Sequence, residues 1–222
     1  LFILNTPSNP AGVCYSGEEL KALGKICAKN NILVLSDEIY DKLVFDNFKH
    51  TTFVQACPEM RDRTILINGA SKSYSMTGWR MGFAAAPKAI IDKMKILQSQ
   101  ELTSIPTFVQ KACVEAFSGC DKEVEEMRKE IQKRRDVMHA ELSKIKGVEC
   151  LKPEGAFYLF PNMKAFGKPT SELAEYLLEE AHVATVAGDG FGAPGYLRLS
   201  YVCEVDVIRE GIEKIKKALE KL

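Results

Sequence analysis

Arg80 comes eight residues after Lys72 in a segment of mostly small side chains, 68–80, that directly follows the apolar run 64–67. A lysine amine can form an imine with an aldehyde, and an arginine fork can bind a phosphate. Asp37 and Asn9 each follow an apolar run of their own, and a carboxylate there can keep a ring nitrogen protonated. Together these side chains suggest a site for pyridoxal phosphate.

Apolar runs that alternate with helical patterns predict the elements that position these residues. Ser16 and Glu19 have the spacing of a capping box and predict a helix start, and a second helix is expected from Pro87. The alternation predicts an α/β fold with a mainly parallel sheet covered on both faces. Four buried strands are expected, at 1–4, 32–35, 64–67 and 81–86.

Ligands of open α/β sheets bind beyond the carboxyl ends of the strands, so Asn9, Asp37 and Lys72 are expected at one edge. Lys72 would form the Schiff base and move the α-proton of a substrate, although a lone loop lysine can also be merely solvated. Asp37 would pair with the pyridine nitrogen, whereas a strand-end aspartate taken alone can be a helix cap. Tyr40 and Asn9 could both donate to the phenolic oxygen of the ring.

Arg198 lies within the otherwise apolar run 196–200. A buried guanidinium requires a partner, and the α-carboxylate of a substrate would suit it. The alternative interpretation is a structural ion pair.

The second part of the chain predicts a smaller α+β domain. A long amphipathic helix is expected from Asp121 to the region of Gly147, with its basic groups, including the triplet 133–135, on a solvated face. Strands are expected at 155–160 and 196–200, a helix from Ser171, and a last helix with isoleucines on one stripe. The predicted domains are 1–120 and 121–222.

Composition excludes several classes of function. Thirty basic and thirty acidic residues cancel, which favours neither nucleic acid nor an anionic membrane as a partner. No apolar run approaches the roughly 18 residues that span a bilayer. Seven cysteines without a C-x-x-C pair predict reduced thiols and a cytoplasmic location. Three scattered histidines give no metal-binding spacing, so no metal is expected.

Two further motifs, one for dinucleotide binding and one of penicillin-binding enzymes, are excluded by the sequence. The glycine-rich segment 188–192 has the wrong spacing for a dinucleotide site and is followed by Ala193 and Pro194 instead of a helix. Gly69 stands three residues before Lys72, so the S-x-x-K arrangement of penicillin-binding enzymes is also missing.

The segments 5–12, 36–40, 71–80 and 195–200, in this order, resemble the class I aminotransferases of fold type I, in the aspartate and aromatic branch. The resemblance runs the length of the chain. It implies a pyridoxal phosphate enzyme that moves an amino group from aspartate or an aromatic amino acid to a 2-oxo acid. It also implies part of the large domain of that fold, a smaller C-terminal domain, and a homodimer with active sites at the subunit boundary.

The same resemblance implies the roles of individual residues. Lys72 would be the imine-forming lysine, and Arg198, with Asn9, would bind the substrate carboxylate. The cofactor contacts would be Asn9, Asp37, Tyr40, Ser71, Lys72 and Arg80.

The sequence departs from that family in two ways. Some branches carry a phosphate-binding serine where this chain has Gly69. The chain also opens within an apolar strand without an initiator methionine, and such enzymes have about as much chain again upstream. We therefore expect a fragment that is a poor catalyst on its own.

Two other hypotheses about the function stay open. The same fold could serve a carbon–sulfur β-lyase or an aminocyclopropane-carboxylate synthase. A non-enzymatic reading is the effector domain of a transcription regulator, which the neutral charge does not support.

Overall fold

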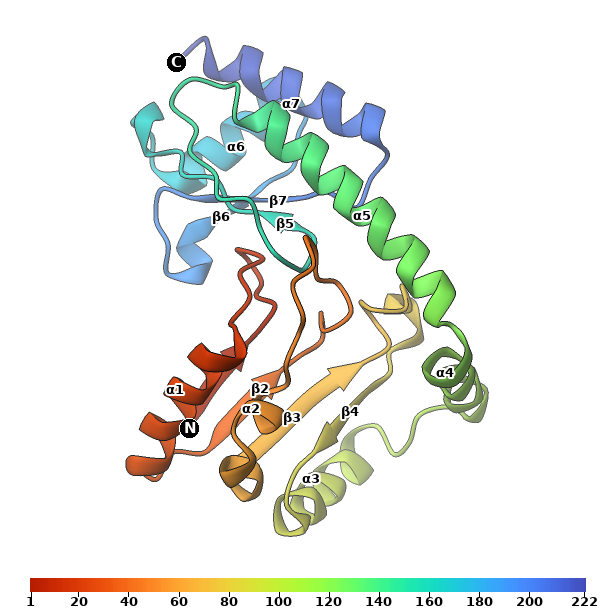
Figure 1. Cartoon of the computed structure of the whole chain (residues 1–222). Coiled ribbons are helices and arrows are strands. Elements are labelled where there is room, and N and C mark those ends of the chain that lie inside the picture. Colours follow the sequence, from red (N-terminus) through yellow and green to blue (C-terminus); the bar gives the residue numbers. More distant parts are fainter. The chain divides into compact units, whose positions relative to one another are not determined.

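The computed structural model describes all residues, 1–222. Internal contacts divide the chain into two compact units, the first comprising 1–8 and 13–126, the second 9–12 and 127–222 (Figure 1). The short segment 9–12 thus belongs with the C-terminal part. The boundary predicted at 120/121 stays a prediction.

The first unit contains a four-stranded sheet in the order β1-β2-β3-β4. The first three strands are parallel, as the sequence predicts for a mainly parallel sheet, and β4 is antiparallel to β3. The residues between β3 and β4 hold a short 3₁₀ helix, Thr77–Trp79, and no crossover helix, which a parallel neighbour would need. The strands are β1 (Phe2–Asn5), β2 (Val34–Asp37), β3 (Thr64–Gly69) and β4 (Gly82–Ala85).

The register brings the carboxyl ends of the parallel strands level. Asn5 pairs with Asp37, and Asp37 pairs with Ile67. The Asn5 side-chain amide and the Thr6 backbone N–H both donate to the carbonyl oxygen of Asp37, each at 3.2 Å. The loops that follow these strands therefore leave the sheet from one edge.

Helices flank this sheet and pack on it unequally. The predicted capping box of α1 is present, since Ser16 Oγ accepts from the Glu19 N–H and the Glu19 carboxylate accepts from the Ser16 N–H at 2.8 Å. The helices of the first unit are α1 (Gly17–Lys29), α2 (Phe53–Ala56), α3 (Lys88–Glu101) and α4 (Thr107–Gly119), and α5 begins at Asp121.

The side of α1 and α2 holds the main core of this unit. Its buried members are Leu4, Leu20, Cys27, Val34, Phe53, Cys57 and Met60.

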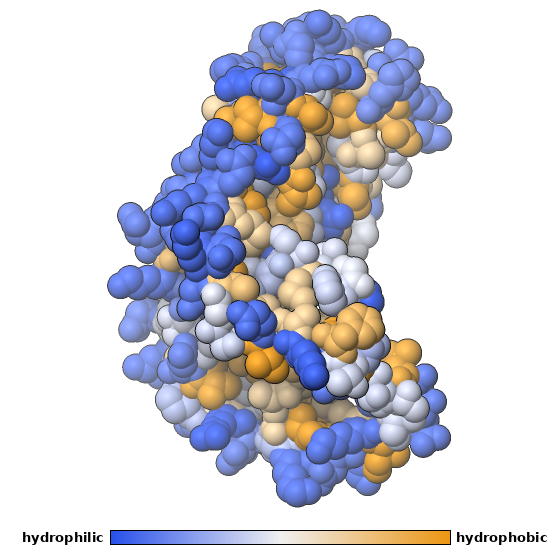
Figure 2. All heavy atoms as spheres, turned by 90° about the vertical axis from the view of Figure 1, so that its right-hand side faces the viewer, coloured by the Kyte–Doolittle hydropathy of each residue, from blue (hydrophilic) through white to orange (hydrophobic).

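The side of α3 is open. The helix α3 has no buried residue, and the Phe83 side chain of β4 is 44% exposed. An open cavity of about 1090 Å³ lies there, lined by β4, α3 and the start of α4. Figure 2 shows apolar side chains at the surface between charged ones. The cover expected on both faces of the sheet is therefore incomplete.

The second unit is an α+β arrangement, as the sequence predicts. Its three short strands are antiparallel in the order β5-β7-β6. The strand predicted at 155–160 is limited to Tyr158–Leu159. Ala156 has a positive φ of 58°, which interrupts the extended backbone before it, and Pro161 has no N–H for the ladder. The elements are α5 (Asp121–Leu142), β5 (Tyr158–Leu159), α6 (Thr170–Ala181), β6 (Val186–Ala187), β7 (Leu197–Ser200) and α7 (Val205–Leu219).

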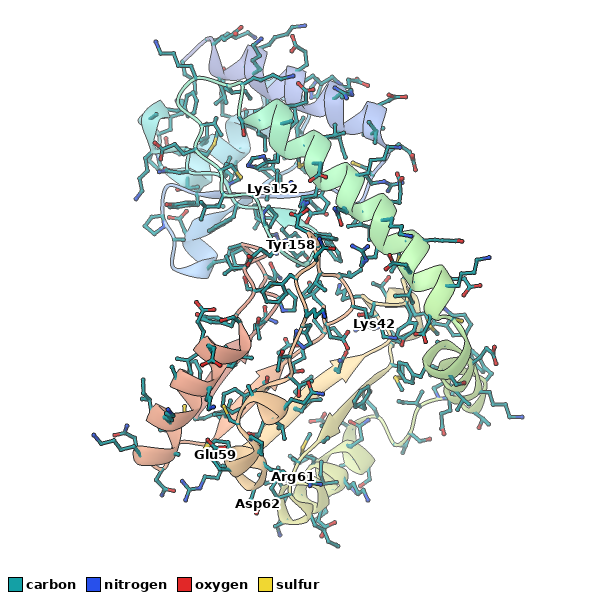
Figure 3. All side chains as sticks on the ribbon, in the orientation of Figure 1. Lys42, Glu59, Arg61, Asp62, Lys152 and Tyr158 are labelled. Carbon is teal, nitrogen blue, oxygen red and sulfur yellow. The ribbon has the colours of Figure 1, made fainter.

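One expectation about α5 is wrong. Arg135, in the basic triplet expected on a solvated face, is fully buried. Its guanidinium donates to the carbonyl oxygen of Pro153 at 2.8 Å and to the Asp136 carboxylate at 2.7 Å, and Lys152 contacts the same carboxylate at 3.0 Å (Figure 3). These contacts balance the buried charge, which a helical charge pattern alone cannot reveal.

All seven cysteines are free thiols, and four of them are buried. No helix combines the length and the apolar character needed to cross a membrane.

Candidate active site

Asp37 ends β2 and is half-buried. Burial raises the pKa of its carboxyl group, the hydrogen bond from the Ile39 N–H at 3.2 Å lowers it, and the neighbouring charge of Glu38 raises it further. The net pKa is raised, so the ionised form is disfavoured in this environment. A cation placed against this carboxylate would relieve that cost.

The residue after Asp37 anchors the same loop to the core. Glu38 is 1% exposed, and its Oε1 accepts from the Ser36 hydroxyl at 2.8 Å and the Phe53 N–H at 2.9 Å. Its Oε2 lies 3.1 Å from His50 Nε2. Sequence reasoning missed Glu38 and His50, although an acidic residue directly after a buried strand was a usable signal.

Tyr40 lies in this loop and is 3% exposed. The following Asp41 reaches the loop that carries Lys72, because Ser73 Oγ donates to Asp41 Oδ1 at 2.8 Å and Asn68 Nδ2 donates to Asp41 Oδ2 at 3.0 Å. Sequence reasoning missed Asp41 as well. The loops of Asp37 and Lys72 are thus in direct contact at one sheet edge.

Lys72 itself is half-buried in the turn after β3, next to the half-buried Ser71. The carbonyl oxygen of Lys72 accepts from the Ser75 N–H at 3.2 Å, which closes the turn. Ser75 has a positive φ of 53°, in the left-handed region that non-glycine residues seldom adopt.

Gly69 is required by the close approach of β3 and β4. A Cβ atom at this position would lie 2.7 Å from the Met81 carbonyl oxygen and 2.9 Å from Gly82 Cα. A serine here would therefore collide with backbone. The hydroxyl group nearest in sequence to Lys72 on its N-terminal side is that of Ser71.

Arg80 also has a left-handed backbone, with φ 53° and ψ 45°. Its side chain is exposed, and Nη1 donates to the Thr77 carbonyl oxygen at 2.7 Å. The guanidinium thus lies on the surface of its own turn. Its phosphate-binding role stays a prediction.

The second unit contains Asn9 and Arg198. Nη1 of Arg198 donates to Asn9 Oδ1 at 2.7 Å, and the guanidinium carbon lies 4.6 Å from the ring centre of Tyr158 and 5.2 Å from that of Phe191. Arg198 is half-buried rather than buried. Its contacts are an amide and two aromatic rings, with no carboxylate among them, so they do not form the structural ion pair considered above.

The turn that carries Asn9 is fixed to the same unit. Gly12 has φ +66°, and its carbonyl oxygen accepts from the Gly155 N–H at 2.9 Å. A Cβ at Gly12 would lie 2.5 Å from Pro153 Cβ, so a glycine is needed. The hydrogen bond from Arg135 holds Pro153 in turn.

The structure therefore gathers the predicted residues in two sets. Asp37, Tyr40, Ser71 and Lys72 lie on loops at one edge of the first sheet, and Asn9 pairs with Arg198 in the second unit. The donor set of the first unit fits pyridoxal phosphate. It offers an amine for the aldehyde, a phenol for the ring oxygen, and a half-buried carboxyl group whose ionised form a cation, such as a protonated ring nitrogen, would stabilise.

Comparison with known proteins agrees with this chemistry. Residues 1–215 match the family described as "Aminotransferase class I and II". The chain therefore belongs to the class I and II aminotransferases, and it has the mixed α/β fold of fold type I enzymes.

Among individual relatives, the chain is 44% identical to an aspartate aminotransferase of Geobacillus stearothermophilus over 98% of its own length. It is 41% identical over its whole length to an asparagine–oxo-acid transaminase of Streptococcus mutans. The crystal structure of an aromatic aminotransferase from Pyrococcus horikoshii superposes with a TM-score of 0.95 at 36% identity, over 99% of this chain. The chain spans 57%, 58% and 59% of these three proteins.

Proposed function

We propose that the chain is the lysine-bearing part of a pyridoxal phosphate-dependent aminotransferase that acts on aspartate or an aromatic amino acid and a 2-oxo acid. The observation that carries the proposal is the half-buried Asp37, with its raised pKa, on a loop in direct contact with the loop of Lys72. Family membership over residues 1–215 supports the same conclusion.

Bound pyridoxal phosphate supplies an electron-withdrawing ring that stabilises negative charge at the α-carbon of the amino acid. Lys72 would hold the cofactor through its aldehyde group, and the Lys72 amine would be the base that moves the α-proton of the substrate. Asp37 keeps the ring nitrogen protonated. Tyr40 donates a hydrogen bond to the phenolic oxygen of the ring.

Ser71 and Arg80 contribute to binding of the cofactor phosphate in this proposal. Arg80 would exchange its bond to the Thr77 carbonyl oxygen for a charge-assisted bond to a phosphate oxygen, which is stronger.

Arg198 and Asn9 bind the α-carboxylate of the substrate. The two rings beside Arg198 orient the planar guanidinium, and the neutral amide of Asn9 leaves its positive charge available to an anion. A carboxylate can accept two parallel hydrogen bonds from such a fork.

The names of the relatives cover aspartate, asparagine and aromatic substrates. The preferred amino donor therefore needs a substrate screen, with 2-oxoglutarate as the first acceptor. We further propose a cytoplasmic homodimer, for which seven free thiols and the aminotransferase family give support. Light scattering of the purified protein measures the subunit number.

The test uses two proteins, the 222-residue chain and a longer one that contains it within a chain of the relatives' length. Each is incubated with pyridoxal phosphate, amino acids and 2-oxo acids, and the products are identified by mass spectrometry. We expect amino-group transfer in the longer protein and poor turnover in the 222-residue chain. Ammonia together with pyruvate would instead support the β-lyase reading.

Covalent capture gives an independent readout. Borohydride reduction in the presence of pyridoxal phosphate, followed by peptide mapping, is expected to place the cofactor on Lys72. Reduction onto other lysines, with Lys72 unmodified, contradicts the proposal.

A further inference from the structure

Asp41 joins the loop that carries Asp37 to the loop that carries Lys72. Its N–H donates to the Glu38 carbonyl oxygen at 3.0 Å, which closes the turn after Asp37. Its carboxylate accepts from Ser73 Oγ at 2.8 Å and Asn68 Nδ2 at 3.0 Å. Asp41 Oδ1 also accepts from the Lys42 N–H of its own loop at 2.8 Å. Asp41 is therefore fixed within one loop, and its carboxylate joins that loop to the other.

The two side-chain donors to the Asp41 carboxylate lie on either side of Lys72 in sequence. Ser73 follows Lys72 directly and is 1% exposed, so its hydroxyl needs an acceptor within the protein. Asn68 is near the end of β3, and its Oδ1 accepts from the Gly69 N–H at 2.7 Å. The turn bearing Lys72 is thus held before and after the lysine.

Lys42 and Tyr74, which follow Asp41 and Ser73, form a second contact between the two loops. Lys42 Nζ lies 5.1 Å from the ring centre of Tyr74 and 3.0 Å from the Asp121 carboxylate at the start of α5 (Figure 3). Burial lowers the pKa of Lys42, but the contacts with Tyr74 and Asp121 outweigh it and raise the pKa overall. Residues 41 and 42 therefore contact residues 73 and 74 in the same order.

We propose that Asp41 is a positioning residue, which fixes the Lys72 amine relative to the Asp37 carboxylate for cofactor attachment and proton transfer. The inference rests on the proposed function. A carboxylate is needed at 41, because both of its oxygens accept. An amide there would present an NH₂ group to the NH₂ group of Asn68.

The donor and the acceptor of the hydrogen bond between Asn68 and Asp41 can be exchanged by mutation. In Asp41→Asn one donor faces another, and in Asn68→Asp two carboxylates face each other. In the double variant the amide of residue 41 donates to the carboxylate of residue 68, which still accepts from the Gly69 N–H. Asp92→Asn on α3 is a matched control, because Asp92 forms an i,i+4 ion pair with Lys88 at the surface.

In the holoenzyme we expect each single variant to lower kcat about 10- to 100-fold with KM changed less than about threefold, because the lysine is misplaced rather than removed. The double variant should recover to within about threefold of wild type. The Ser75 amide donates to the Lys72 carbonyl oxygen and the Met76 amide to that of Ala70, at 3.4 Å. In the cofactor-free protein, hydrogen exchange of these two amides should be about tenfold faster in Asp41→Asn and normal in the double variant. Asp92→Asn should change neither readout.

If Asp41→Asn does not fold, Ser73→Ala removes one donor only and should lower kcat about three- to tenfold. Wild-type kcat and exchange in Asp41→Asn, or a double variant no better than the singles, would overturn the role of Asp41. A wild-type enzyme without borohydride-trapped cofactor on Lys72 would overturn the proposed function instead.

Discussion

The two sets of candidate site residues hold their charges by different means. In the first unit the Asp37 carboxylate accepts a hydrogen bond within its own loop, burial raises its pKa, and hydrogen bonds to Asp41 hold that loop against the turn of Lys72. In the second unit the Arg198 guanidinium lies against two ring faces and one amide. The first arrangement suits bond making and breaking, which needs fixed atoms, and the second suits an anchor that receives a carboxylate.

The largest effect is expected from Lys72→Ala. If the first set performs the chemistry, amino-group transfer should fall on the order of 10⁴-fold or more, because no other group replaces the attacking and proton-moving amine. Steady-state kinetics measure it. Lys111→Ala, an exposed lysine on α4, is the matched control and should retain wild-type activity.

Asp37→Asn should lower kcat about 10²- to 10³-fold, since a neutral amide cannot hold the ring nitrogen protonated. The same substitution should raise the free energy of unfolding of the cofactor-free protein at neutral pH. Because the pKa of Asp37 is raised in the folded state, its contribution to stability is present at low pH and is lost as pH rises through the folded pKa.

The Asn variant should therefore be more stable than wild type at neutral pH. The difference should vanish below about pH 4, the ordinary pKa of aspartate. Urea unfolding at several pH values measures this difference, with the exposed Asp62→Asn as control. A destabilised Asn variant at pH 7 would contradict the assigned electrostatics.

Arg198→Lys should mainly affect substrate binding. A lysine keeps the charge but loses the planar fork, so KM for the amino acid should rise about 10- to 100-fold with a smaller change in kcat. Absorbance of the bound cofactor should stay as in wild type. A fall in kcat at unchanged KM would instead show that Arg198 takes part in the chemical step and does not mainly bind the substrate carboxylate.

The smallest expected effect is a change in the reactivity of the Cys150 thiol. Cys150 precedes the loop at Pro153 and Gly155, which contacts the turn that carries Asn9. Burial raises the pKa of this thiol to about 11, against a smaller lowering by a backbone hydrogen bond. Its alkylation rate should therefore rise about tenfold per pH unit between pH 8 and 10. A plateau by pH 9, measured by mass spectrometry, would show that the loop opens and that the second set is less fixed than described.

Local patterns in the sequence predict much of this molecule. The capping box of Ser16 and the strands of the first sheet depend on residues close in sequence, and the structure has them. The candidate residues at the strand ends could be named for the same reason, since the carboxyl edge of a parallel sheet follows from topology.

Contacts between distant segments could not be predicted in the same way. Asp41 and Ser73 are 32 residues apart, so neither the tie between their loops nor its polarity follows from periodicity. Arg135 appeared solvated because helical charge patterns do not include the loop at Pro153. The antiparallel direction of β4 likewise depends on a connection without a crossover helix.

The close approach at Gly69 limits how this protein can evolve. A side chain there would meet the backbone at Met81 and Gly82 rather than a flexible neighbour, so a single replacement by serine would displace the edge strand β4. In this chain a side chain at position 69 therefore requires a matching change in the backbone of the segment that begins β4.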